Sequence, residues 1–78
     1  MSDYVPTEKG LSRVRSGVAN YIGRHYPAIP AHARHVMARD IVATARPLAT
    51  SQRDLMRRAI FLANAGMSIR DNPNGAVA

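Results

Sequence analysis

The chain has 78 residues, and its 11 Lys and Arg against 5 Asp and Glu give a formal net charge of +6. This length suits one small domain. The absence of Cys excludes a disulfide framework, a thiolate metal site and a cysteine nucleophile. No apolar run approaches the roughly 18 residues of a membrane span. The charged residues Asp3, Glu8 and Lys9 stand where a signal peptide would be apolar. We therefore expect a cytoplasmic protein that does not enter the membrane.

The first predicted helix spans residues 8–25 and follows a flexible leader, residues 1–7. Its mostly apolar stripe recurs every three or four residues, as on one helix face: Leu11, Val14, Val18, Tyr21, Ile22 and His25. Pro27 and Pro30 end the helix, because each disfavours helical backbone in the residue before it. Gly10, Gly17 and Gly23 weaken it, each by about 1 kcal/mol relative to Ala.

The second predicted helix spans residues 31–46. Pro30 suits its start, where a missing N–H is no loss, and Pro47 stops it. Its expected inward stripe is Ala33, Met37, Ile41, Val42, Thr44 and Ala45.

The third predicted helix spans residues 52–65. Ser51 and Asp54 match the Ser-x-x-Asp start signal, and Leu48 is placed to act as a hydrophobic staple. Its expected buried stripe is Leu55, Met56, Ala59, Ile60, Leu62 and Ala63. Gly66 is expected to end the helix in the left-handed conformation, with Met67 or Ile69 folding back onto the last turn. Residues 70–78 form a predicted disordered tail.

Three amphipathic helices with short loops predict an all-α fold, a small three-helix bundle, with residues 8–69 as one domain. The alternative is two packed helices with the first helix peripheral or swapped. The 13 Ala residues favour helix but bury little side-chain area. The core is therefore marginal, and a second copy or a partner would add burial.

Basic residues dominate the folded part of the chain. Between Lys9 and Arg70 there are 11 basic residues and two acidic ones, Asp40 and Asp54, so this part carries 11 − 2 = +9. Ten of the eleven are Arg, which pairs bidentately with phosphate or carboxylate. The codon usage of a GC-rich genome is the competing explanation for the abundance of Arg.

On helical wheels the basic residues form a strip on each helix. The strips are Lys9, Arg13, Asn20 and Arg24; His32, His35, Arg39 and Arg46; and Arg53, Arg57 and Asn64. Strips on every helix favour contact with a phosphate backbone or an acidic protein over the reading of bases. Tyr4, Tyr21 and Tyr26 do not alternate with these strips, which counts against a base-stacking platform.

The sequence predicts neither catalysis nor a cofactor. His25, His32 and His35 are the residues that could bind a metal, but their Arg neighbours and the absence of Cys argue against a cation. The Ser residues stand at cap or exposed positions, and phosphate-binding loop motifs are absent. Asp40 and Asp54 are more readily explained as an Arg neighbour and a helix cap. We expect a protein that is not an enzyme.

The string Ala65-Gly66-Met67-Ser68 is similar to strings in winged-helix and mercury-regulator-type proteins. That resemblance implies a helix-turn-helix whose second helix begins here. Pro73 falls in the second turn of that helix, where proline breaks helical structure. We therefore do not expect a sequence-specific helix-turn-helix.

Phe61, the single Phe, faces away from the apolar stripe of the third helix and lies between Arg57, Arg58 and Asn64. One interpretation is that this helix is buried on both sides, as the central helix or in a dimer. The other is that Phe61 is an exposed anchor with arginines around it, the composition of a binding hot spot.

These features predict a small basic protein that regulates or inhibits a larger protein or a ribonucleoprotein complex. By composition it is similar to accessory and anti-defence proteins of phages and mobile elements. The predicted partner-binding residues are Phe61, Arg57, Arg58 and Arg53. The alternative is sequence-tolerant nucleic-acid binding through Arg13, Arg24, Arg39, Arg46, His32 and His35. A homodimer is a further arrangement compatible with the small core.

Overall fold

The computed structural model describes residues 4–71, with side chains described up to residue 66. It contains α1 (Glu8–His25), α2 (Ala31–Ala45), the short 3₁₀ helix η1 (Arg46–Leu48) and α3 (Gln52–Asp71). No strand occurs within this described part of the chain. The predicted all-α fold with three helices is confirmed.

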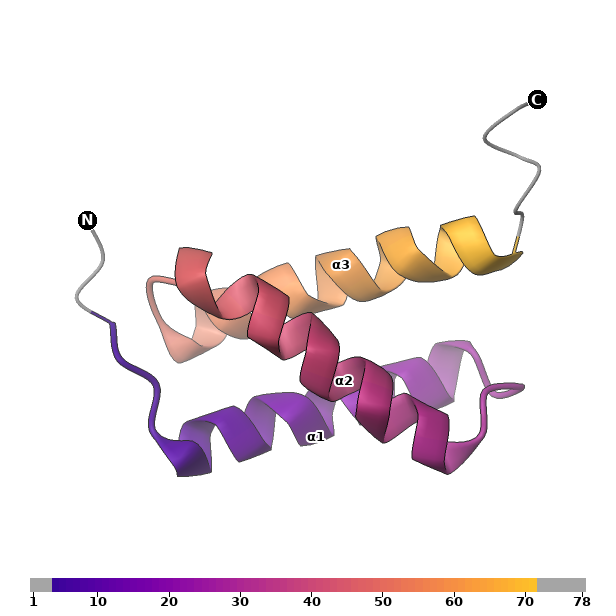
Figure 1. Ribbon diagram of the computed structural model, residues 1–78, viewed down its shortest axis with the longest axis horizontal. Coiled ribbons are helices and arrows are strands. Elements are labelled where there is room, and N and C mark those ends of the chain that lie inside the picture. Colours follow the sequence, from indigo (N-terminus) through magenta and orange to yellow (C-terminus); the bar gives the residue numbers. More distant parts are fainter. Residues whose placement is uncertain (1–3, 72–78) are drawn as a thin grey trace.

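The three helices pack against one another so that each contacts the other two. In Figure 1, α1 and α3 run in the same direction, and α2 crosses both of them diagonally. The alternative with a peripheral first helix is therefore not observed. Because α2 covers one side of the α1–α3 pair, the opposite side of that pair faces solvent.

The core lies at the centre, where the apolar faces of the helices meet. Its buried residues are Leu11, Val14, Val18, Ala19, Ile22, Ala38, Val42, Ala45, Ala49, Leu55, Ala59 and Ala63. Six of these twelve are Ala, so the helices can approach closely but bury little side-chain area. Tyr4, within the predicted leader, is half-buried and packs against this core.

The bounds of α1 are those predicted, and local signals set both of its ends. Thr7 is the N-cap, and its Oγ1 accepts a 3.0 Å hydrogen bond from the backbone N–H of Gly10. At the other end the N–H of Tyr26 donates to the carbonyl of Ile22 at 2.7 Å. The prolines that follow prevent further helical turns.

Arg34 holds the loop between α1 and α2, a role the sequence reading missed. Its Nε donates to the carbonyl of Ile29 at 2.7 Å, and its Nη2 donates to the carbonyl of Pro27 at 3.3 Å. A Cβ on Gly23 would lie 2.9 Å from Nη1 of this guanidinium. The Arg34 side chain therefore lies against Gly23, and a larger residue there would require it to shift.

The inward face of α2 differs from the predicted stripe. The buried residues are Ala38, Val42 and Ala45, whereas Thr44 is exposed. Thr44 Oγ1 instead donates to the carbonyl of Asp40 at 3.0 Å, which satisfies the hydroxyl within its own helix. The α-helix ends at Ala45, one residue before the predicted end, because the chain tightens there into η1.

The start of α3 confirms the predicted Ser-x-x-Asp signal. Ser51 Oγ accepts a 3.0 Å hydrogen bond from the N–H of Asp54. In return, Asp54 Oδ2 accepts from the N–H of Thr50 at 3.0 Å and from Arg58 Nε at 2.8 Å. The helix N-terminus thus has both a hydroxyl cap and a carboxylate, which its dipole favours.

The predicted end of α3 at Ala65 is wrong, because the helix continues to Asp71. Gly66 does not adopt the left-handed conformation, and no described glycine has a positive φ. Glycine permits that conformation but does not require it, and Gly66 has no neighbouring atoms that would force the chain to turn. Residues 70 and 71 of the predicted tail therefore belong to α3, whereas residues 72–78 and the side chains of Met67 and Ile69 lie outside the described part.

None of the helices within residues 4–71 combines the length and apolar character that crossing a bilayer would need.

Candidate interaction surfaces

An apolar groove, here called the Phe61 groove, runs between α3 and the end of α2. It is lined by Thr44, Ala45, Leu48, Asp54, Arg57, Arg58, Phe61 and Leu62. Its apolar lining comes from η1 and both helices, so the groove forms only when α2 packs on α3. The sequence pattern of α3 alone could therefore not reveal it.

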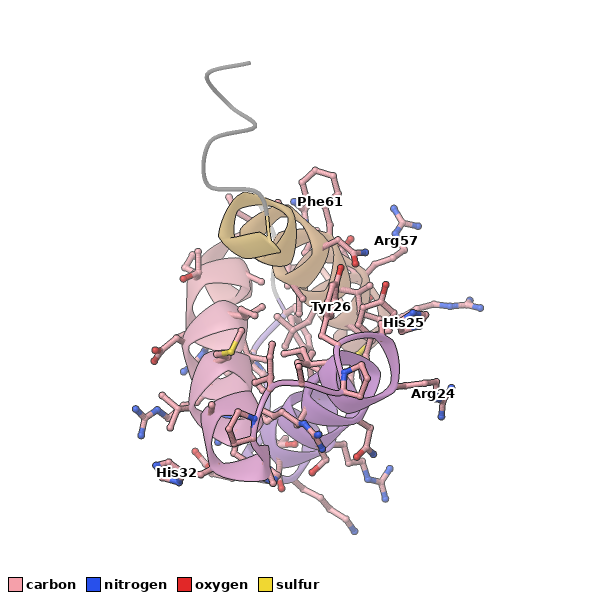
Figure 2. All side chains as sticks on the ribbon, turned by 90° about the vertical axis from the view of Figure 1, so that its right-hand side faces the viewer. Arg24, His25, Tyr26, His32, Arg57 and Phe61 are labelled. Atoms are coloured by element: carbon pink, nitrogen blue, oxygen red, sulfur yellow. The ribbon has the colours of Figure 1, made fainter. Side chains whose placement is uncertain are left out.

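Phe61 is 72% exposed and Leu48 is 65% exposed. Figure 2 shows Phe61 projecting from α3 away from the body of the bundle. Within this chain α3 is therefore not buried on both sides, so Phe61 is not covered as part of a central helix. Leu48 does not close over the start of α3 as the predicted staple would, since it lies in η1 with most of its surface open.

Arg57 and Arg58 both line the groove, but they differ in whether the guanidinium is paired with an acidic residue. Arg58 pairs with Asp54 at 2.8 Å. The hydrogen bond from Arg58 lowers the pKa of the Asp54 carboxyl, and the N–H of Thr50 adds to this effect. Arg57 has no hydrogen bond or ion pair with any described residue. Its charge is therefore available to a ligand.

A second surface lies where α1 and α3 pack side by side. A Cβ on Gly17 of α1 would clash with the end of the Met56 side chain of α3. Val14, Gln52, Arg53, Met56, Arg57 and Ile60 line a shallow hollow between the same two helices. The end of the Met56 side chain therefore lies against Gly17, and the basic strips of α1 and α3 lie on neighbouring helices.

We call the combined surface the basic face. It consists of the exposed residues Lys9, Arg13, Asn20 and Arg24 of α1 and Arg53, Arg57 and Asn64 of α3. Helical periodicity puts Arg13 and Arg24 next to Gly17, towards α3, whereas Lys9 and Asn20 lie further round α1. Figure 2 shows Arg24 and Arg57 on the same side of the bundle, away from α2. The sequence predicted the two strips but not that they form one surface.

Aromatic rings lie within the basic face. Tyr21 and Tyr26 donate hydrogen bonds to the same oxygen, Asn64 Oδ1, at 2.9 and 3.2 Å. The ring centroids of Tyr21 and His25 are 4.3 Å apart. In Figure 2, His25 appears on the same side of the bundle as Arg24 and Arg57, and Tyr26 lies nearer the centre. The fold thus brings Tyr21 and Tyr26 against Asn64 of the α3 strip, a proximity that the sequence did not predict.

The basic strip of α2 does not join this surface. His32, His35, Arg39 and Arg46 are exposed, and Arg39 lies 3.7 Å from Asp40. In Figure 2, His32 lies on the opposite side of the bundle from Arg24 and His25. Among the described residues, no group of three or more His, Asp or Glu side chains is placed to hold a metal ion.

Two other arginines are partly buried in the bundle. Arg34 binds the loop carbonyls described above. Arg15 is half-buried, and its Nε is the one buried side-chain polar atom without a hydrogen-bond partner in the described part. These two side chains are not presented on either surface.

The groove and the basic face therefore offer different chemistry. The groove presents two large apolar side chains beside arginine, whereas the basic face presents several cations with aromatic rings near Asn64. No protein-family model matches the chain, and no curated protein or solved structure matches it significantly.

Proposed function

We propose that the chain is a non-enzymatic binding protein whose Phe61 groove holds an apolar, acidic segment of a larger protein. Binding there would regulate or inhibit that protein or the ribonucleoprotein complex to which it belongs. The observation that carries the proposal is the exposure of Phe61, 72%, in a groove that also contains the exposed Leu48.

Exposed aromatic and aliphatic side chains in one groove favour burial against a partner. Covering an exposed Phe contributes about 1.5–3 kcal/mol. Ala45 and Leu62 add apolar lining beside Phe61 and Leu48. An aromatic anchor next to arginine is the composition of interface residues that dominate binding energy.

The charge around the groove favours an acidic partner over a second copy of the chain. Arg57 is unpaired among the described residues, and the whole chain carries +6. Two copies would bring like charges together in a homodimer, which disfavours association. Acidic side chains beside the apolar anchor of a foreign partner would instead pair with Arg57 and steer its approach.

The test compares Phe61→Ala with Val5→Ala in capture from host lysate treated with nuclease, followed by titration of the purified partner. Val5 is 79% exposed but lies outside the groove, so it controls for the loss of any exposed apolar side chain. We expect Phe61→Ala to weaken binding about 30-fold, equivalent to about 2 kcal/mol. Val5→Ala should change binding less than about twofold by the same scale.

Three outcomes would contradict the proposal. The first is a partner that both variants bind as tightly as the wild type does. The second is capture that is lost on nuclease treatment. The third is a wild-type dimer in sedimentation that Phe61→Ala converts to monomer, which would assign the groove to a second copy.

A further inference from the structure

We propose that the basic face binds single-stranded nucleic acid, with backbone phosphates on the arginines of α1 and α3 and a base stacked on His25. This activity is separate from the protein partner proposed for the groove. It rests on the way in which α1 and α3 combine their basic strips, which neither strip shows alone.

The cations of this surface are free to bind phosphate. Within residues 4–66 the ion pairs are Arg39 with Asp40 and Arg58 with Asp54, and neither pair includes a residue of the basic face. Arg13 and Arg24, eleven residues apart on α1, are separated by about 16 Å at 1.5 Å per residue. On the neighbouring helix, Arg53 and Arg57 line the hollow between α1 and α3, level with the part of α1 that contains Arg13. Two such rows form a track that a phosphate backbone can follow.

The aromatic group beside this track is held in place. Asn64 accepts from the hydroxyls of Tyr21 and Tyr26, and the Tyr21 ring covers one side of His25 at 4.3 Å. His25 itself is exposed. A base that stacks on His25 would therefore meet a ring that already packs on Tyr21, so part of the side-chain freedom is lost before binding.

These features favour a single strand over a duplex. Only unpaired bases present a free face for stacking on a protein ring. The arginines also lie on two adjacent parallel helices, which form a broad face and not a single protruding helix that could enter a major groove. We therefore expect binding that tolerates changes of base sequence.

The experiment measures the fluorescence anisotropy of a labelled oligothymidylate of about 16 nucleotides, the upper end of common site sizes. The variant Arg24→Gln/Arg53→Gln removes two cations of the basic face. The variant Arg39→Gln/Arg46→Gln, called the α2 variant, removes the exposed cations Arg39 of α2 and Arg46 of the adjoining η1, and it is matched in charge. Thermal unfolding of all variants checks that they fold.

We expect the basic-face variant to bind at least about tenfold more weakly, with a salt slope lower by about 1.4, since each lost phosphate contact contributes about 0.7. The α2 variant should lose less than about threefold. His25→Ala should weaken binding about fivefold or more, as lost stacking does, without lowering the salt slope. Phe61→Ala should leave oligonucleotide binding unchanged, which separates this proposal from that for the groove.

Several results would overturn the inference. Equal losses in the two charge-matched variants would mean that net charge alone attracts the oligonucleotide. A duplex of the same length that binds as tightly as the single strand would remove the role of stacking. Absence of oligonucleotide binding by the wild type at low salt would exclude the activity.

Discussion

Tyr21 of α1 donates a 2.9 Å hydrogen bond to Oδ1 of Asn64 on α3, across 43 residues of sequence. Tyr26 donates to the same oxygen at 3.2 Å. The amide thus links the last turns of α1 and the start of the following loop to the middle of α3. It helps to keep the basic strips of the two helices side by side.

Replacing Asn64 should loosen this link. We expect Asn64→Ala to lower the free energy of unfolding by about 0.5–1.5 kcal/mol relative to Asn20→Ala, because both hydroxyls lose a partner but can still bond water. Asn20, an exposed Asn on α1, corrects for the helix propensity gained in an Asn→Ala change. Urea denaturation gives both values. Equal stabilities of the two variants would show that the shared acceptor contributes nothing.

Gly66 offers a test of the continuation of α3. Because the helix passes through Gly66 and a Cβ there meets no other atom, Gly66→Ala should stabilise the protein by about 0.5–1 kcal/mol. Gly17→Ala is the comparison, and its gain should be smaller because the Met56 side chain must move. Thermal unfolding measures both. Destabilisation by Gly66→Ala would instead indicate a helix end at this glycine.

The pairing of Asp54 with Arg58 at the start of α3 should make the free energy of unfolding depend on pH. The hydrogen bond from Arg58 keeps the pKa of Asp54 below its ordinary value. In the unfolded chain the pKa of this carboxyl is about 3.9. Between this value and the lower pKa of the folded state, the unfolded chain binds more protons than the folded one. The stabilisation is fully present above about pH 3.9 and is lost as the pH falls through the lowered folded pKa.

Thermal unfolding across the acid range checks this dependence. The difference in melting temperature between wild type and Asp54→Asn should shrink as the pH falls, and Asp40→Asn controls for the loss of one negative charge. A difference that stays constant with pH would show that the ionised carboxylate is not what stabilises the helix start.

Phe61 and Leu55 lie on different sides of α3, Phe61 at the surface and Leu55 in the core. Phe61→Ala should change the free energy of unfolding by less than about 0.5 kcal/mol, because the ring is mostly exposed. Leu55→Ala, at a fully buried position, should cost about 2–5 kcal/mol. Urea denaturation of the free chain distinguishes them. A cost for Phe61→Ala similar to that for Leu55→Ala would place Phe61 in the core.

Features with a local cause could be predicted from sequence. Thr7 and the prolines after Tyr26 set the bounds of α1, and Ser51 sets the start of α3. The periodicity of α3 already placed Phe61 away from the core. The end at Gly66 was not predictable in this way, because a glycine allows both a helix end and a continuing helix.

Features created by contacts between distant residues could not be predicted. The shared acceptor Asn64 is distant in sequence from both tyrosines that bind it, and no local pattern marks such a pair. In the sequence nothing distinguishes Arg34 from the other basic residues of α2. Its role depends on the folded loop, which brings the carbonyls of Pro27 and Ile29 to its guanidinium. The groove likewise needs the packing of η1 and α2 on α3, whereas periodicity reports only one helix at a time.

Arg57 lines both the Phe61 groove and the hollow between α1 and α3. One guanidinium cannot give its full set of hydrogen bonds to a carboxylate in the groove and to a phosphate on the basic face at once. The two proposed ligands would therefore compete for this side chain, which is negative thermodynamic coupling. Such coupling is reciprocal, so each ligand would weaken the other by the same factor, and replacing Arg57 would reduce that factor.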